Sequence, residues 1–201
     1  MPCVQRVERT RKKDRMTTQT QLAAQARRLG ELLKHRDLKI VFAESCTGGL
    51  ISASLTRIPG ISAYHCGSAV VYQVETKTSW LGISPKILNK PGPVSREVAL
   101  EMAEQVLKIT PAADVSASVT GYLGPGAPKR QDGVIYVAVA QRTSHCKTER
   151  PRIVVRKHRL TDEVPVAHRK RDEVLRLRRQ LSAARFVLAM VGSFLDDSNG
   201  Q

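Results

Sequence analysis

The sequence predicts an α/β protein, with a single three-layer α/β/α domain around a mainly parallel or mixed sheet. Segments of helical periodicity alternate along the chain with short apolar, β-leaning runs, as expected for helices that cover a sheet. Glycine-containing loops follow two of these runs, at the edge where open α/β sheets bind ligands. The length of 201 residues and the hydrophobic content of 41% suffice for one packed core.

Residues 17–193 are predicted to form this domain, between a basic leader at 1–16 and a flexible tail at 194–201. The leader, MPCVQRVERTRKKDRM, is polar and has no apolar periodicity, so we expect it to be disordered. It lacks the apolar core of a secretory signal, and no apolar run in the chain approaches the ~18 residues of a membrane span. We therefore expect a cytoplasmic protein without membrane contact.

The first half of the domain alternates helix and strand. Apolar residues at helical spacing predict an amphipathic helix over 18–35, and the apolar run that follows, 39–43, is predicted to be a buried strand. The next helix begins after a pair of glycines and ends near Pro59-Gly60, a typical stop signal. The stretch 62–72 is predicted to be a second strand, with a possible bulge at Gly67.

The second half continues the alternation. A short helix is predicted over 74–81, and the next begins with Ser84 as its cap and Pro85 at its first position. Ser95 caps a longer amphipathic helix. Further strands are predicted at 114–119, 134–140 and 153–155, and a closing helix at 172–191.

The chain is strongly basic, with 33 Lys and Arg against 18 Asp and Glu and a net charge of +15. Such an excess can mark a nucleic-acid surface. Only 4% of the residues are aromatic, however, which leaves few side chains on which bases could stack. We expect nucleic-acid binding to be weak and non-specific at most.

The cysteines argue against a metal or disulfide framework. All four are widely spaced without a CxxC pair, as is usual in a reducing compartment. His65-Cys66 and His145-Cys146 are adjacent pairs, and adjacent residues on a strand face opposite ways, so neither pair easily chelates one ion. We expect no metal and no cofactor.

Two loops are predicted to meet at one edge of the sheet. ESCTGG, residues 44–49, follows the first strand, and TGYLGPG, residues 120–126, follows the strand at 114–119. Backbone N–H groups at a helix start favour a phosphate or an oxyanion. Neither loop is a Walker A, GxGxxG or GxSxG motif, and by generic rules Ser45 or Thr47 could simply cap the helix.

ESCTGG, the AVVY run, Lys77 and VTGxxGPG, in this order and at this separation, resemble the CinA C-terminal domain family. The resemblance extends from about Leu22 to about Val191. It implies a single α/β/α domain that forms homodimers. It also implies a nicotinamide-nucleotide amidase, which converts nicotinamide mononucleotide to nicotinic acid mononucleotide and ammonia in pyridine-nucleotide recycling.

Amide hydrolysis needs a nucleophile, a base and donors for the oxyanion, and the resemblance implies which residues supply them. Ser45 matches the motif serine and is the predicted nucleophile, with Cys46 as a rival that we expect to point into the core. Lys77 matches a family lysine and can act as the base only if its pKa is lowered. Tyr72 could bond the serine or the lysine and relay a proton, and the choice between these two bases stays open.

The predicted substrate-binding residues come from both loops and from the last helix. Glu44 is expected to orient the loop or the lysine, and Thr120 to meet the phosphate, the ribose or the oxyanion. Arg171 roughly matches a GDR stretch of the family and would meet a phosphate, unless it belongs to a solvated basic face. The complete set is Glu44, Cys46, Thr47, Gly48, Gly49, Thr120, Gly121, Gly124, Gly126 and Arg171.

The sequence also departs from the family. The usual YSN is replaced by Tyr72-Gln73-Val74, Tyr122 and Leu123 replace small residues, and the stretch after the second loop reads KRQDGVIY. An alternative hypothesis is therefore a catalytically silent relative that binds a nucleotide or a partner and is linked to competence or the DNA damage response. A third is a nucleic-acid-associated protein that uses the basic charge.

Overall fold

A mixed sheet of five strands forms the centre of the computed structural model, which describes residues 2–128, 130–143, 151–161 and 171–197. The strands are β1 (Ile40–Glu44), β2 (His65–Val70), β3 (Val115–Gly121), β4 (Val134–Gln141) and β5 (Arg152–Arg159). Their order across the sheet is β2-β1-β3-β4-β5. The strand β1 pairs in parallel with β2 and β3, whereas β4 is antiparallel to both its neighbours.

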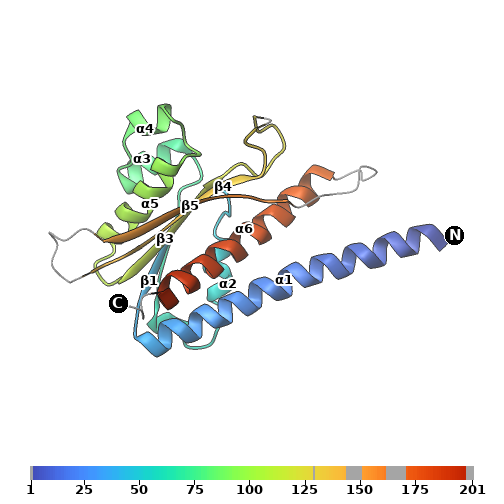
Figure 1. Ribbon diagram of the computed structural model, residues 1–201, viewed down its shortest axis with the longest axis horizontal. Coiled ribbons are helices and arrows are strands. Elements are labelled where there is room, and N and C mark those ends of the chain that lie inside the picture. Colours follow the sequence, from blue (N-terminus) through green and yellow to red (C-terminus); the bar gives the residue numbers. More distant parts are fainter. Residues whose placement is uncertain (1, 129, 144–150, 162–170, 198–201) are drawn as a thin grey trace.

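Helices cover both faces of the sheet, which confirms the predicted α/β class (Figure 1). On one face lie α1 (Pro2–Arg36), α2 (Leu50–Leu55) and α6 (Arg171–Asp196). On the other lie α3 (Val74–Leu81), α4 (Pro85–Asn89) and α5 (Arg96–Ile109). Each layer buries its own apolar cluster against the sheet, with Phe42 of β1 in one cluster and Val41 in the other. This alternation follows from the period of two along a strand.

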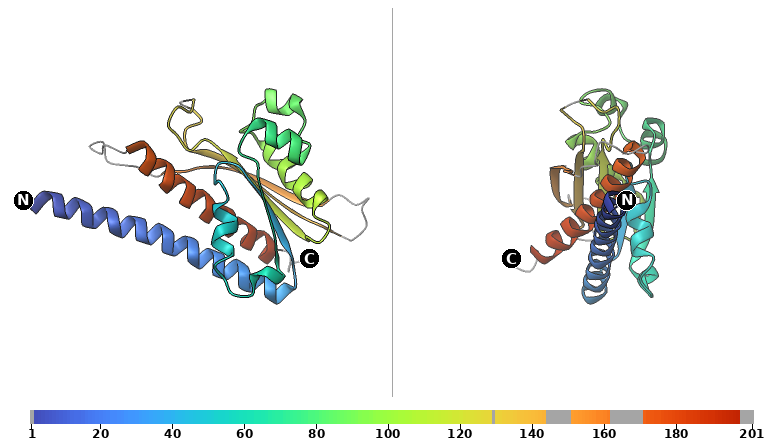
Figure 2. Two further views of the ribbon diagram at one scale, coloured as in Figure 1. Left: turned by 180° about the vertical axis from the view of Figure 1, so that it is seen from behind. Right: turned by 90° about the vertical axis from the view of Figure 1, so that its right-hand side faces the viewer.

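The leader differs from the prediction. The structure continues α1 back to Pro2, so residues that we expected to be disordered extend the amphipathic helix. Figures 1 and 2 show this N-terminal part of α1 extending well beyond the rest of the domain. Glu, Arg, Lys, Gln and Met are good helix formers, and no Gly or Pro follows Pro2 in the leader. Helix propensity can therefore extend the helix without an apolar stripe.

The C-terminal boundary also lies later than 193. The helix α6 continues to Asp196, and Phe194 and Leu195 are buried in the core. The remainder of the predicted tail, 198–201, lies outside the described residues.

The predicted strand at 62–72 is shorter in the structure. A 3₁₀ turn (Ile61–Ala63) occupies its start, and β2 runs only from His65 to Val70. The register with β1 shifts between the pairs Ile40↔His65 and Val41↔Gly67, which places an irregularity beside Gly67, as predicted. Gly67 has a φ of 133°, in the region that favours glycine.

The parallel pairing of β1 with β3 determines where the two glycine-containing loops lie. Glu44, at the end of β1, is paired with Val119 of β3, so both strands end at the same edge of the sheet. The backbone N–H of Ser45 donates to the Val119 carbonyl at 3.1 Å. The first loop therefore begins directly beside the second.

Candidate active site

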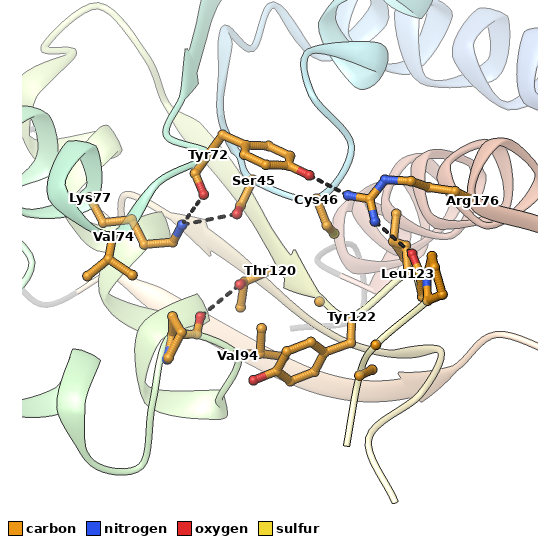
Figure 3. Close-up of a pocket in the computed structure, with 16 residues that line it drawn as sticks. Ser45, Cys46, Tyr72, Val74, Lys77, Val94, Thr120, Tyr122, Leu123 and Arg176 are labelled. Carbon is orange, nitrogen blue, oxygen red and sulfur yellow. Dashed lines mark hydrogen bonds between the residues drawn. The ribbon is translucent and has the colours of Figure 1, made fainter. Parts of the chain in front are cut away.

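A pocket of about 270 Å³ lies at this edge of the sheet (Figure 3). The two loops, the start of α3 and the helix α6 surround it. Its described lining consists of Ser45, Cys46, Tyr72, Val74, Lys77, Pro93, Val94, Thr120, Gly121, Tyr122, Leu123, Gly124, Pro125, Gly126, Ala127 and Arg176. Eight of the thirteen residues predicted to be catalytic or substrate-binding are among them, although they come from segments far apart in the chain.

Ser45 and Lys77 are in direct contact in this pocket. The Lys77 Nζ lies 3.0 Å from the Ser45 Oγ, and Figure 3 shows the two side chains pointing toward one another. The same Nζ donates to the carbonyl oxygens of Val71 at 2.7 Å and Tyr72 at 3.3 Å. A protonated amine can donate to all three oxygens. A neutral amine can donate to the two carbonyls and accept the serine proton on its lone pair.

The surroundings of Lys77 favour this neutral form. Its side chain is only 2% exposed, and burial lowers the pKa of the amine from 10.5 to about 8. A lysine with this pKa is deprotonated often enough near neutral pH to accept a proton from a hydroxyl. The contact therefore has the chemistry of a nucleophile and its base.

Cys46 is the poorer nucleophile of the adjacent pair. It lines the pocket, but its side chain is buried, and this burial raises the pKa of the thiol to about 12. The thiolate is the reactive form of cysteine and is scarce at neutral pH when the pKa is so high. Its burial agrees with the expectation that Cys46 behaves as a small hydrophobe.

Glu44 orients the first loop and does not line the pocket. Its buried carboxylate accepts five hydrogen bonds, from the hydroxyl groups of Thr47 and Ser68 and from the backbone N–H groups of Gly49, Ile51 and Ser52. A carboxylate at the N-terminus of α2 also complements the helix dipole. These bonds agree with the expectation that Glu44 orients the loop, whereas its place in the predicted substrate-binding set has no support from the lining of the pocket.

Thr47, Gly48 and Gly49 likewise lie outside the described lining of the pocket. Gly48 has a φ of 62° and Gly49 a φ of 94°, so the turn of the loop itself requires glycine at both positions. Among the described residues, none accepts a hydrogen bond from the backbone N–H of Thr47, and the N–H of Cys46 donates only to the thiol of the same residue. These two groups remain candidate donors to an oxyanion.

The second loop forms the opposite wall of the pocket. Thr120, Gly121, Gly124 and Gly126 all line it. The Thr120 hydroxyl donates to the Pro93 carbonyl at 2.8 Å, so its proton is engaged while its oxygen can still accept. The roles of these residues toward phosphate, ribose or oxyanion remain predictions.

Tyr72 does not contact the serine or lysine through its hydroxyl. The side chain is 53% exposed, and the hydroxyl accepts a hydrogen bond from Arg176 of α6. Only the backbone carbonyl of Tyr72 contacts Lys77. The titratable side chain in contact with Ser45 is therefore Lys77, which corrects the expectation that the Tyr72 hydroxyl bonds either residue.

Arg176 is a pocket residue that the sequence did not single out. We predicted Arg171, which begins α6 and whose side chain lies outside the described part of the structure. Arg176 lies one and a half turns further along and also donates to the Gly124 carbonyl at 2.8 Å. It stands in the run RLRRQLSAAR, where no spacing separates the pocket-facing arginine from its neighbours.

A second arginine of α6 binds the stretch that follows the second loop. Arg179 donates to both carboxylate oxygens of Asp132, at 2.7 and 2.8 Å, and is almost fully buried. Hydrogen bonding to Arg179 lowers the pKa of Asp132. Asp132 belongs to the KRQDGVIY stretch that departs from the family pattern, so this pair is built from residues that the resemblance could not supply.

Neither a metal cluster nor a membrane span is found in the part of the chain that the structure describes. No group of three or more His, Cys, Asp or Glu side chains is arranged to hold an ion within those residues. Within the same residues, no helix combines the length and the apolar character needed to cross a membrane.

The chain is similar to competence-damage proteins in sequence. A putative competence-damage inducible protein of Halothermothrix orenii is 44% identical over 122 residues, which cover 60% of this chain and 29% of that protein. A protein of the same description from Acetivibrio thermocellus is 46% identical over 112 residues, which cover 55% of this chain and 27% of that protein. The match thus spans less than a third of the length of these curated relatives.

The chain is also similar to solved structures of such proteins. The crystal structure of the competence/damage inducible protein CihA from Agrobacterium tumefaciens superposes with a TM-score of 0.73 at 29% identity, covering 88% of this chain and 96% of that chain. A CinA superfamily protein from Klebsiella pneumoniae superposes with a TM-score of 0.74 at 23% identity, which shows the common fold. The CinA C-terminal domain matches residues 22–167, and the chain therefore belongs to the CinA C-terminal domain family.

Proposed function

We propose that the protein is a serine amidohydrolase that converts nicotinamide mononucleotide to nicotinic acid mononucleotide and ammonia without a metal. The observation that carries the proposal is the 3.0 Å contact between the Ser45 hydroxyl and the buried Lys77 amine in the pocket. The choice of substrate follows from the family resemblance. The pocket volume of about 270 Å³ lies just below the usual range of about 300–1,000 Å³ for small-molecule sites, which favours a small ligand such as a mononucleotide.

The first half of the reaction forms an acyl-enzyme. Ser45 Oγ attacks the carboxamide carbon while its proton passes to Lys77 Nζ. The N–H groups of Cys46 and Thr47 are the donors nearest in sequence for the oxyanion of the tetrahedral intermediate. As the carbon–nitrogen bond breaks, Lys77 returns the proton to the leaving ammonia, and the acyl group remains esterified to Ser45.

The second half hydrolyses the ester. Water attacks the acyl carbon and gives a proton to Lys77, which passes it back to Ser45 Oγ as the carboxylic acid leaves. The two carbonyls of Val71 and Tyr72 hold the amine in place throughout, because they accept from it in both of its protonation states. No step requires a histidine or a metal ion.

The proposal is tested by ammonia release from nicotinamide mononucleotide. We expect Ser45→Ala, Lys77→Met and the double variant to lose a similar factor, about 10³ or more in kcat, because groups that act as a unit are not additive. Ser54→Ala is a matched control, since Ser54 is as buried as Ser45, at 7% exposed, but lies outside the described lining of the pocket. A chelator should leave the rate unchanged.

Two results would contradict the proposal. If Ser45→Ala keeps near-normal activity while Cys46→Ala loses it, the nucleophile is the cysteine. If the purified wild type releases no ammonia, the amidase function itself is refuted.

A second candidate is a catalytically silent relative that binds a nucleotide or a partner, as in a competence or damage response. Val74 favours it, because this apolar side chain lines the pocket where the family usually carries a polar one, and it is 40% exposed. The same assay separates the two functions, because a silent protein would bind the mononucleotide without releasing ammonia.

A further inference from the structure

We propose that Arg176 forms an anion-binding subsite in the pocket and holds the phosphate of a nucleotide ligand. Figure 3 shows Arg176 reaching the pocket from α6, on the side opposite Lys77, with Ser45 between them. The identity of the anion as a mononucleotide phosphate rests on the proposed amidase function. The preference for an anion follows from the charges around the pocket.

The pocket carries positive charge without a carboxylate to neutralise it. Its sixteen described lining residues include Lys77 and Arg176 but no Asp and no Glu. The two neighbouring carboxylates are engaged elsewhere, Glu44 by the first loop and the N-terminus of α2, and Asp132 by Arg179. A cation that is partly withdrawn from water without an ionic partner favours the binding of an anion.

Arg176 and Lys77 contribute differently to the positive charge of the pocket. Lys77 must be neutral to accept the serine proton, and its lowered pKa allows that. A guanidinium is always protonated, so Arg176 is the fixed positive charge of the described lining in the active form.

The guanidinium of Arg176 also has donors to spare. It donates to two neutral oxygens, the Gly124 carbonyl and the Tyr72 hydroxyl. These two bonds use two of its five N–H groups, and a phosphate presents several oxygens to the remaining ones. The bond to Gly124 fixes the guanidinium against the second loop, so that the charge is held at the pocket before a ligand arrives.

The test compares ligands that differ only in the phosphate. Calorimetry would measure the binding of nicotinic acid mononucleotide and of the corresponding riboside to the wild type and to Arg176→Gln and Arg176→Lys. We expect Arg176→Gln to lose about 10- to 100-fold in affinity for the mononucleotide and nothing for the riboside, as for a charged hydrogen-bonding group. Arg176→Lys should recover part of the loss, because it keeps the charge but not the planar fork.

A matched control is Arg185→Gln, which removes an arginine from the same helix that contacts Gln21 and lies outside the described lining of the pocket. It should bind both ligands like the wild type. Thermal melting of each variant would exclude unfolding as the cause of lost binding. In the ammonia assay, Arg176→Gln should raise KM and preserve kcat, because the phosphate is remote from the reacting carbon.

The outcomes separate this inference from the amidase proposal. Phosphate-dependent binding that Arg176→Gln abolishes supports the subsite even if no ammonia is released, in which case only the amidase function fails. Ammonia release with an unchanged KM in Arg176→Gln overturns the subsite and leaves the amidase standing. Equal loss of riboside and mononucleotide binding, or no preference of the wild type for the mononucleotide, also overturns it.

Discussion

Replacing Lys77 with methionine should remove activity and, at neutral pH, stabilise the fold. Burial lowers the pKa of this amine from 10.5 to about 8, so the native state holds a proton less readily than the unfolded chain does. Below pH 8 both states carry the proton, and the native state bears the full cost of a buried charge. As the pH rises from 8 to 10.5, the native amine is already neutral and the cost disappears.

The magnitude follows from the two pKa values. The fall from 10.5 to about 8 corresponds to a cost of roughly 3 kcal/mol below pH 8. Methionine removes this cost and fills a similar volume, but it leaves the Val71 and Tyr72 carbonyls without their donor. The third partner, the Ser45 hydroxyl, lines the pocket and can bond water instead. At ~1 kcal/mol for each lost hydrogen bond, Lys77→Met should be about 1 kcal/mol more stable at pH 7. Near pH 10 it should be less stable than the wild type.

Urea unfolding of both proteins at pH 7, 8.5 and 10 would measure the difference in the free energy of unfolding. The matched control is Lys86→Met, which replaces an exposed lysine of α4. The reasoning is wrong if the difference between Lys77→Met and the wild type keeps the same sign and size across this range. Lys77 would then not be a buried amine with a lowered pKa, and its role as base would lose its support.

Three further predictions concern the base and the second loop. The wild-type kcat/KM for ammonia release should rise about tenfold from pH 7 to pH 9. The reason is that the neutral fraction of Lys77, with a pKa of about 8, rises from ~9% to ~91% over this range. A flat profile would exclude Lys77 as the base. Asp132→Asn should lower the melting temperature by several degrees and raise KM. It weakens the ion pair with buried Arg179, which joins the stretch after the second loop to α6. Gly121→Ala should cost about 1–3 kcal/mol in urea unfolding, because its Cβ would lie 2.5 Å from Ile135 Cγ2. Gly192→Ala meets nothing within 4 Å and is its control.

Periodicity predicted most of the fold because each helix and strand buries one face or both. The helix caps at Ser84 and Ser95 were also predictable, since both side chains accept the expected backbone N–H. The leader differs in the structure, where α1 continues into it. Its sequence carries no apolar stripe, so helix propensity is the only signal for that continuation. The pairing of β1 with β3, which brings the loops together, depends on contacts remote in sequence. The general rule that ligands bind beyond the carboxyl ends of strands predicted only that the two loops share an edge.

The candidate site could be predicted only where a motif carried it. Ser45 and Lys77 matched family positions, and the structure places their side chains in contact. Glu44 belongs to the same motif, yet the sequence could not show that its carboxylate accepts hydrogen bonds from both the loop and the first turn of α2. Arg176 lies among many arginines of α6, and only the packing of that helix beside the second loop selects it.

The residues that depart from the family pattern supply none of the hydrogen-bond partners of the Lys77 amine. The three oxygens around the Lys77 amine belong to Ser45 and to the backbone carbonyls of Val71 and Tyr72, so none of them depends on the side chain at position 74. Val74 and Tyr122 instead line the walls of the pocket, where a ligand would touch them. The changes therefore bear on which ligand fits and how tightly it binds, whereas the proposed activation of the serine depends on the burial of Lys77 and on backbone carbonyls that this chain retains.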